Sequence, residues 1–177
     1  KDKYSFKIYP LIQSVAKCIA KDKSIERLGV MATEATVKTQ TYTKEFKKNN
    51  PNIKIIEQAC PLWVPIVEKT LTQYDEKQIM TDYLKDIIAF NPQKVILGCT
   101  HYPYLIDTIS KYAKRELFIN PAKIFAEYIK EDLTLNNMRT TKEQSSVHYC
   151  ASSDPEHFKH NAQMFLQIEE EPELVEL

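Results

Sequence analysis

Apolar residues along the chain follow two patterns that alternate, and together they predict strands and helices in turn. Short runs with few polar residues, such as 27–32 and 94–98, are typical of strands buried on both faces of a parallel sheet. Segments with apolar residues three and four positions apart predict amphipathic helices. The predicted strands are 27–32, 53–57, 94–98, 117–119 and 147–151. The predicted helices are 10–20, 34–48, 78–90, one that begins at Pro103, 121–133 and 155–167, with a loop or short helix at 61–69.

This order of elements predicts an α/β fold, a parallel sheet with helices on both faces. In such sheets the functional crevice lies at the carboxyl ends of the strands. Two polar segments follow predicted strands, namely Thr33–Thr36 and Cys99–Pro103. They are therefore the first candidates for a functional site.

Composition excludes several classes of protein. The 177 residues carry 24 basic and 24 acidic side chains, so overall basicity gives no reason to expect a nucleic-acid or membrane-surface partner. No apolar run approaches the roughly 18 residues that span a bilayer. Gly29 and Gly98 are the two glycines of the chain, which excludes glycine-rich phosphate loops.

The four cysteines, Cys18, Cys60, Cys99 and Cys150, are widely spaced and match neither a zinc pattern nor a disulfide framework. We therefore expect reduced thiols and a cytoplasmic protein. The sequence begins at Lys1 without Met and without the apolar segment of a signal peptide, so we expect a processed chain or a fragment. The acidic segment 169–177 is expected to be a solvated tail.

Cys99 and His101 are the main candidates for catalysis. Cys99 lies between a strand and a predicted helix, and a helix N-terminus stabilises a thiolate. His101, two residues later, can share a face with Cys99 and act as its acid or base. The alternative is that Cys99 is a structural thiol and His101 a surface helix cap, and position alone leaves both open.

Thr33, Thr36 and Glu68 are weaker candidates. The two threonines flank a predicted helix start, where hydroxyls and free N–H groups can hold a carboxylate, although plain N-capping is the simpler interpretation. Glu68 follows an apolar stretch and can face an imidazole, although a solvated carboxylate is more usual.

A metal site is not expected. Several histidines and cysteines are candidate ligands, but no pair has tight ligand spacing to another pair. These candidates are His148, Cys150, His157 and His160, together with Cys99 and His101.

Three ordered segments, 97–103 (LGCTHYP), 32–38 (ATEATVK) with Tyr42, and 60–68 (CPLWVPIVE), stand in the chain. Together they resemble the glutamate racemases, a family of cofactor-independent amino-acid racemases, over about residues 8–170. The segment 97–103 (LGCTHYP) is similar to the family's second catalytic-cysteine motif. The segment 32–38 (ATEATVK), with Tyr42, resembles its threonine-rich substrate segment, and 60–68 (CPLWVPIVE) resembles a third motif of the family.

The resemblance implies racemisation of glutamate for peptidoglycan synthesis, by two cysteines on opposite faces of the substrate α-carbon and without a cofactor. It implies that Cys99 is one of the two and that His101 assists it. Thr100 and His101 would bind substrate, Glu68 would orient His101, and Thr33 and Thr36 would line the glutamate pocket.

The sequence also departs from the family pattern. The family's Asp-Ser and Cys-Asn-Thr motifs, the second of which holds the first catalytic cysteine, do not occur here. Asn120-Pro121-Ala122 stands where an acidic-Ser-Gly turn is common. We therefore expect residues 1–118 to be a complete α/β domain and 119–177 to be the C-terminal part of a second one.

The missing motifs imply that the isolated chain is inactive and that a missing N-terminal half or a second subunit completes the site. The complete protein would be a homodimer. Three alternatives stay open. The chain is a racemase for aspartate or another amino acid, a non-catalytic remnant that binds a partner or a carboxylate ligand, or a cysteine hydrolase that uses Cys99 and His101.

Overall fold

The structure is a computed structural model that describes residues 6–141 and 146–176. These residues form two compact units, one extending to Arg139 and the other beginning at Thr140. The predicted division at residue 118, into parts of two family domains, stays a prediction. Leu177, the last residue of the predicted tail, lies outside the described residues.

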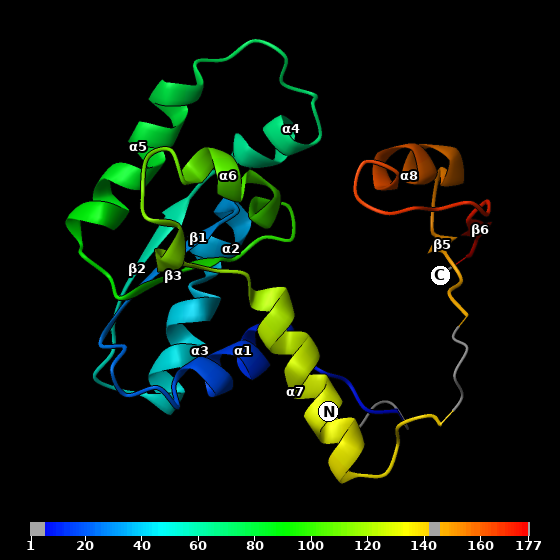
Figure 1. Cartoon of the computed structure of the whole chain (residues 1–177), viewed down its shortest axis with the longest axis horizontal. Helices are drawn as coiled ribbons and strands as arrows, with labels where there is room; N and C mark the ends of the chain where they lie inside the picture. Colours follow the sequence, from blue (N-terminus) through cyan, green and yellow to red (C-terminus); the bar gives the residue numbers. More distant parts are fainter. Residues whose placement is uncertain (1–5, 142–145, 177) are drawn as a thin grey trace. The chain divides into compact units, whose positions relative to one another are not determined.

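The first unit is built on a four-stranded parallel sheet with the strand order β2-β1-β3-β4. The strands are β1 (Arg27–Ala32), β2 (Lys54–Ala59), β3 (Lys94–Leu97) and β4 (Phe118–Ile119). Helices pack on both faces of this sheet, as Figure 1 shows. The predicted α/β fold is therefore confirmed.

The helices that surround the sheet have the following bounds. They are α1 (Leu11–Ile19), α2 (Glu34–Thr39), α3 (Thr41–Asn49), α4 (Trp63–Val67), α5 (Glu76–Ala89), α6 (Ile106–Ile109) and α7 (Pro121–Leu135). Short 3₁₀ helices lie at η1 (Tyr102–Leu105) and η2 (Arg115–Leu117).

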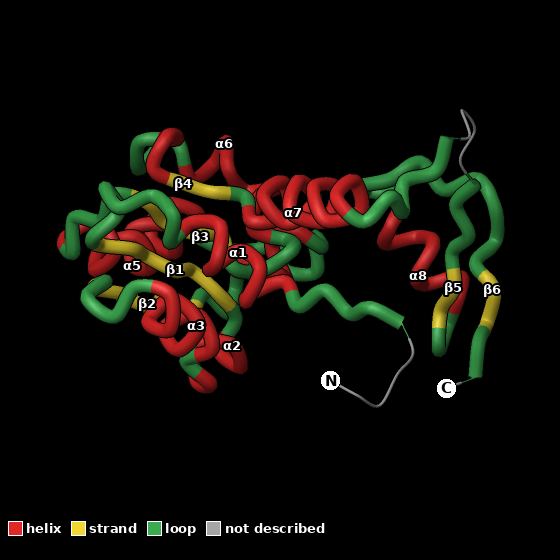
Figure 2. Tube along the Cα trace, turned by 90° about the horizontal axis from the view of Figure 1, so that it is seen from below, coloured by secondary structure: helices red, strands yellow, loops and turns green. Residues whose placement is uncertain are grey.

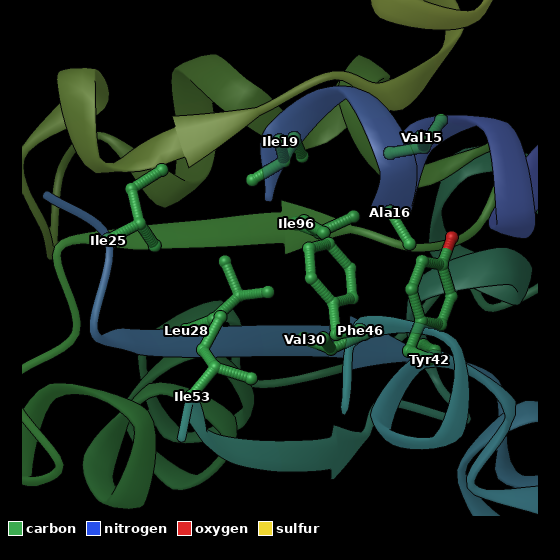
Figure 3. Close-up of a cluster of buried hydrophobic side chains, with 11 residues drawn as sticks. Val15, Ala16, Ile19, Ile25, Leu28, Val30, Tyr42, Phe46, Ile53 and Ile96 are labelled. Carbon is green, nitrogen blue, oxygen red and sulfur yellow. The ribbon is translucent and has the colours of Figure 1, made fainter. Parts of the chain in front are cut away.

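Two hydrophobic clusters cover the two faces of the sheet. The central strand β1 sends Leu28 and Val30 into the cluster under α1 and α3, and Met31 into the cluster under α5 and η1. Figure 3 shows the first cluster, in which Tyr42 and Phe46 of α3 face the sheet. Because the strand is buried on both faces, it appears in the sequence as a continuous apolar run.

The segment before α1 is hydrogen-bonded to α7 near the C-terminal end of that helix. Lys7 Nζ and Tyr9 Oη both donate to Asp132 Oδ2, each at 2.5 Å, and the Tyr9 ring packs edge-on against Tyr128. The contact lowers the pKa of Asp132, first through the hydrogen bond from Lys7 and then through that from Tyr9. α1 also packs along α7 (Figure 2).

The predicted helix 34–48 is wrong in one respect, because it is divided at Gln40. This residue has a left-handed backbone with φ 52°, and its N–H donates to the carbonyl of Val37. The hydroxyl of Thr39 bonds to the carbonyl of Thr36 and lies 2.7 Å from that of Thr41. Side-chain hydroxyls that bond to nearby backbone compete with the helix, and here two helices result.

The later helices also differ from the predicted pattern. The helix predicted from Pro103 is only η1 followed by α6, and the apolar face of α7 is half-buried. In the second unit, α8 (Pro155–Ala162) is shorter than predicted, and Phe158 and Leu166 are exposed. A unit this small buries a small share of its apolar surface.

The acidic tail is paired rather than frayed. Its residues Glu173–Leu174 form β6, which runs parallel to β5 (Cys150–Ala151). The backbone N–H groups of Glu173 and Val175 donate to the carbonyls of Tyr149 and Ala151, both at 2.9 Å. Across the described residues, no helix has the length and apolar character needed to cross a membrane.

Candidate functional site

The strand order places two segments at one crevice. The connection from β1 leads to β2 on one side, and that from β3 leads to β4 on the other, so the two connections diverge between β1 and β3. A divergence of this kind opens a crevice at the carboxyl ends of the strands. Gly98 N–H donates to the Met31 carbonyl at 2.7 Å, which sets Thr33 and Cys99 at the neighbouring ends of β1 and β3.

Cys99, His101 and Glu68 lie in a row at this crevice. The Sγ of Cys99 is 3.9 Å from His101 Nδ1, and His101 Nε2 is 3.0 Å from Glu68 Oε1. Cys99 and His101 come from the turn after β3, whereas Glu68 follows the last turn of α4. His101 precedes η1, but its side chain makes no capping hydrogen bond, so the interpretation of this histidine as a helix cap is wrong.

This geometry fixes how a proton can move. Because Glu68 accepts from Nε2–H, Nδ1 of the neutral imidazole is left as the acceptor that faces the Cys99 thiol. The side chains of His101 and Glu68 are 28% and 32% exposed, so their hydrogen bond has limited contact with water. The row can therefore take a proton from Cys99 and hold it.

The three threonines lie in two places. Thr33 Oγ1 and Thr36 Oγ1 are 3.1 Å apart, and Thr33 precedes α2 without a side-chain capping bond, so its hydroxyl is not used as a plain cap. Thr100 Oγ1 lies 3.4 Å from His101 Nδ1. Within the described part of the chain, no hydrogen bond joins Thr33 or Thr36 to Cys99. The assigned roles of all these residues stay predictions.

A pocket of about 470 Å³ opens beside Cys99. Its lining includes side chains that we did not predict as site residues, above all Tyr42 and Asn120. Asn120 follows β4, so the same strand-end rule that identifies Cys99 also points to it. The lining residues are Leu11, Tyr42, Gly98, Cys99, Thr100, Pro103, Tyr104, Asn120, Pro121 and Ala122.

Tyr42 packs directly against the strand end that carries Cys99. A Cβ added to Gly98 would meet Tyr42 Cε2 at 3.0 Å and the Met31 carbonyl oxygen at 3.1 Å, so the glycine allows this close approach. Burial, followed by electrostatic interactions with Cys99 and Glu57, raises the pKa of Tyr42 to about 12. The phenol therefore stays protonated near neutral pH.

The other cysteines differ from Cys99 in their surroundings. Cys60 is buried, and burial raises the pKa of its thiol far above the usual range. Cys18 is half-buried on α1, and Cys150 is exposed in the second unit. In the two described stretches, no three His, Cys, Asp or Glu side chains are grouped closely enough to hold a metal ion.

Comparison with known proteins agrees with the resemblance in sequence. A glutamate racemase of Prochlorococcus marinus (strain NATL2A) is 30% identical over 174 residues, which are 96% of this chain and 64% of that protein. The solved glutamate racemase of Campylobacter jejuni is 30% identical with a TM-score of 0.74, and the match covers 92% of this chain and 64% of that one. By sequence and by fold, the chain is related to the glutamate racemases.

A second solved glutamate racemase, from Francisella tularensis and in complex with D-glutamate, is 26% identical with a TM-score of 0.79. The match covers 94% of this chain and 62% of that racemase. The chain thus spans less than two thirds of the length of these racemases. No protein-family model matches the sequence.

Proposed function

We propose that this chain is the part of a glutamate racemase that carries one of its two catalytic cysteines. The observation that supports the proposal is the row of Cys99, His101 and Glu68 at the strand ends of a chain related to glutamate racemases. The reaction interconverts L-glutamate and D-glutamate by moving the proton on the α-carbon.

The row provides one half of this chemistry. The Cys99 thiol gives its proton to His101 Nδ1, while Glu68 stabilises the imidazolium that forms. The thiolate then removes the α-proton from one face of glutamate and becomes a thiol again. Thr33, Thr36 and Thr100 supply hydroxyls for the substrate's polar groups.

Inversion needs an acid on the opposite face of the α-carbon. Cys60 is enclosed in the core, and neither Cys18 nor Cys150 stands in the Cys-Asn-Thr sequence of the family's first catalytic cysteine. We therefore place the opposing cysteine in protein outside these residues, in an N-terminal segment or a second subunit of a homodimer. The complete enzyme would supply D-glutamate for peptidoglycan precursors in the cytoplasm, without a cofactor.

Exchange of the α-proton with solvent tests this proposal on the chain itself. In D₂O, one cysteine working on one face should place deuterium on one enantiomer of glutamate and produce almost none of the other. NMR of L- and D-glutamate measures the exchange, chiral chromatography measures the inversion, and aspartate run in parallel tests the choice of substrate.

Two variants and one control identify the residues. Cys99→Ser should abolish exchange, and Glu68→Gln should slow it about tenfold, because a hydrogen bond to a charged group is worth roughly 1.5 kcal/mol or more. Cys150→Ser, in the second unit, should exchange like the unchanged chain. Exchange that survives in Cys99→Ser removes Cys99 from the mechanism. Absence of exchange from both enantiomers contradicts the proposal, and rapid inversion by this chain alone refutes the need for an external acid.

A further inference from the structure

Tyr42 is a buried side chain whose hydroxyl makes no hydrogen bond to a described residue. It is 1% exposed, and its ring lies in the pocket beside Cys99. Among the described residues its hydroxyl has no hydrogen-bond partner. Within the part of the chain that the structure describes, the fully enclosed polar atoms without a partner are Arg27 Nε, Glu57 Oε2 and Trp63 Nε1, and the Tyr42 hydroxyl is not among them. The hydroxyl is therefore open to the pocket that Tyr42 lines, and near neutral pH it is protonated and can donate.

The first turn of α7 faces the same pocket. Asn120, Pro121 and Ala122 line it, and α7 is 15 residues long, so its N-terminus favours negative charge. Asn120 Oδ1 accepts from the Ala122 N–H at 3.0 Å, which leaves the amide NH₂ of Asn120 as a donor. The first turn of α7 has no acidic side chain, so no carboxylate of the helix itself interacts with the positive end of its dipole.

The charge of the lining agrees with an anionic ligand. None of the residues around the pocket is an aspartate or a glutamate, and Thr100 adds a further hydroxyl. The Tyr42 hydroxyl has no partner among the described residues, so its donor is available to a ligand in the pocket. We propose that the Tyr42 hydroxyl and the Asn120 amide at the start of α7 form a carboxylate-binding subsite beside Cys99.

The inference deepens the proposed function, and it rests on that function only for the choice of glutamate as the ligand. The subsite would hold one carboxylate of the amino acid while Cys99 faces the α-carbon. It adds two contacts to the threonine hydroxyls that the sequence indicated, and both come from elements outside the Cys99 segment.

Protection of Cys99 from alkylation tests the subsite. Iodoacetamide labels the chain in the presence of increasing L-glutamate, D-glutamate or glutarate, and mass spectrometry of the Cys99 peptide gives the concentration for half-protection. Cys18, in the same samples, is an internal control. Glutarate has the two carboxylates but no α-amino group, so it reports on carboxylate binding separately from racemisation.

Two variants remove the donors without removing the fold. Tyr42→Phe keeps the ring against Gly98, and Asn120→Asp keeps the oxygen that caps α7 while replacing the donor with a negative charge. Each should raise the half-protection concentration about tenfold or more, as expected for a lost hydrogen bond to a charged group. Tyr112→Phe removes a hydroxyl that bonds to Glu76 and should cause no shift. Thermal unfolding should show that Tyr42→Phe and Asn120→Asp remain folded.

The outcomes separate this inference from the proposed function. Wild-type protection in both variants overturns the subsite, and so does a shift in one variant alone or a failure of glutamate and glutarate to protect Cys99. If both variants shift but no α-proton exchange is found, the subsite stands and the racemase proposal fails. If exchange depends on Cys99 but neither variant changes the half-protection concentration, the racemase proposal stands and the subsite fails.

Discussion

Gly98 is the position where one added methyl group should disturb both the sheet and the site. In Gly98→Ala the new Cβ would lie 3.0 Å from Tyr42 Cε2, 3.1 Å from the Met31 carbonyl oxygen and 3.3 Å from Ala32 Cβ. The carbonyl is backbone and already accepts from Gly98 N–H at 2.7 Å, so it cannot withdraw without weakening the β1–β3 pairing. The Tyr42 ring is buried and has little room to move.

Gly29→Ala is a matched control in the same sheet. The nearest atoms to its added Cβ are all side-chain atoms, with Val95 Cγ2 at 3.0 Å and Ile87 Cδ1 at 3.4 Å, and none of the three nearest is backbone. Neither glycine has a positive φ, so the comparison isolates the packing. Overpacking at Gly98 should cost about 1–3 kcal/mol. At Gly29, relief of glycine's conformational freedom offsets most of the strain, so we expect a change within about 1 kcal/mol.

Urea unfolding measures the difference directly. Trp63 is the one tryptophan of the chain and is fully buried, so its fluorescence reports on the first unit. Thermal unfolding gives a second measurement. For a chain of this size, 1 kcal/mol corresponds to roughly 2–4 °C in Tm, so the Tm of Gly98→Ala should be about 2–12 °C lower. A Gly98→Ala variant as stable as Gly29→Ala would refute the argument that backbone contact decides the cost.

Two further predictions concern α3 and its first turns. Gln40→Gly should raise the free energy of unfolding by about 0.5–1 kcal/mol, since glycine adopts the φ of 52° without strain; a loss in urea titration would contradict this. Because burial raises the pKa of Tyr42 from 10.0 to about 12, its contribution to stability is complete below pH 10 and is lost as the pH rises toward 12. The Tyr42→Phe variant should therefore lose less unfolding free energy than the unchanged chain between pH 9 and pH 12, by up to about 3 kcal/mol. Urea titrations across this pH range measure the loss, and an equal loss in both proteins would count against the burial argument.

The sheet could be predicted because its strands have one apolar pattern that few other structures produce. β1 has the predicted bounds, and β3 ends within one residue of them. The break between α2 and α3 could not be predicted in this way. Neither glycine nor proline marks Gln40, and its left-handed backbone depends on hydroxyl bonds among neighbouring threonines. Helical spacing alone predicts one helix there.

The site was predictable to the extent that strand ends determine it. The rule for parallel sheets located Cys99 and Thr33 at one crevice, and the structure has them at neighbouring strand ends. Glu68 lies 33 residues before His101, so its contact depends on where α4 packs. The residues alone gave it as a weaker candidate that can face an imidazole, and the family resemblance named His101 as its partner. Tyr42 was missed as a site residue because a buried tyrosine on an apolar helix face is usually core.

The contact of Lys7 and Tyr9 with Asp132 has a consequence for synthesis of the chain. Lys7 and Tyr9 are 125 and 123 residues away from Asp132 along the sequence. The strands β1, β2 and β3, by contrast, are complete by Leu97. At ribosomal rates of about 5–20 residues per second, Asp132 is added roughly 6–25 s after Lys7. The three-stranded core can pair during this interval, but the segment before α1 must wait for α7. Docking of Lys7 and Tyr9 therefore follows synthesis of α7, which places this segment among the later parts of the unit to become protected from proteases.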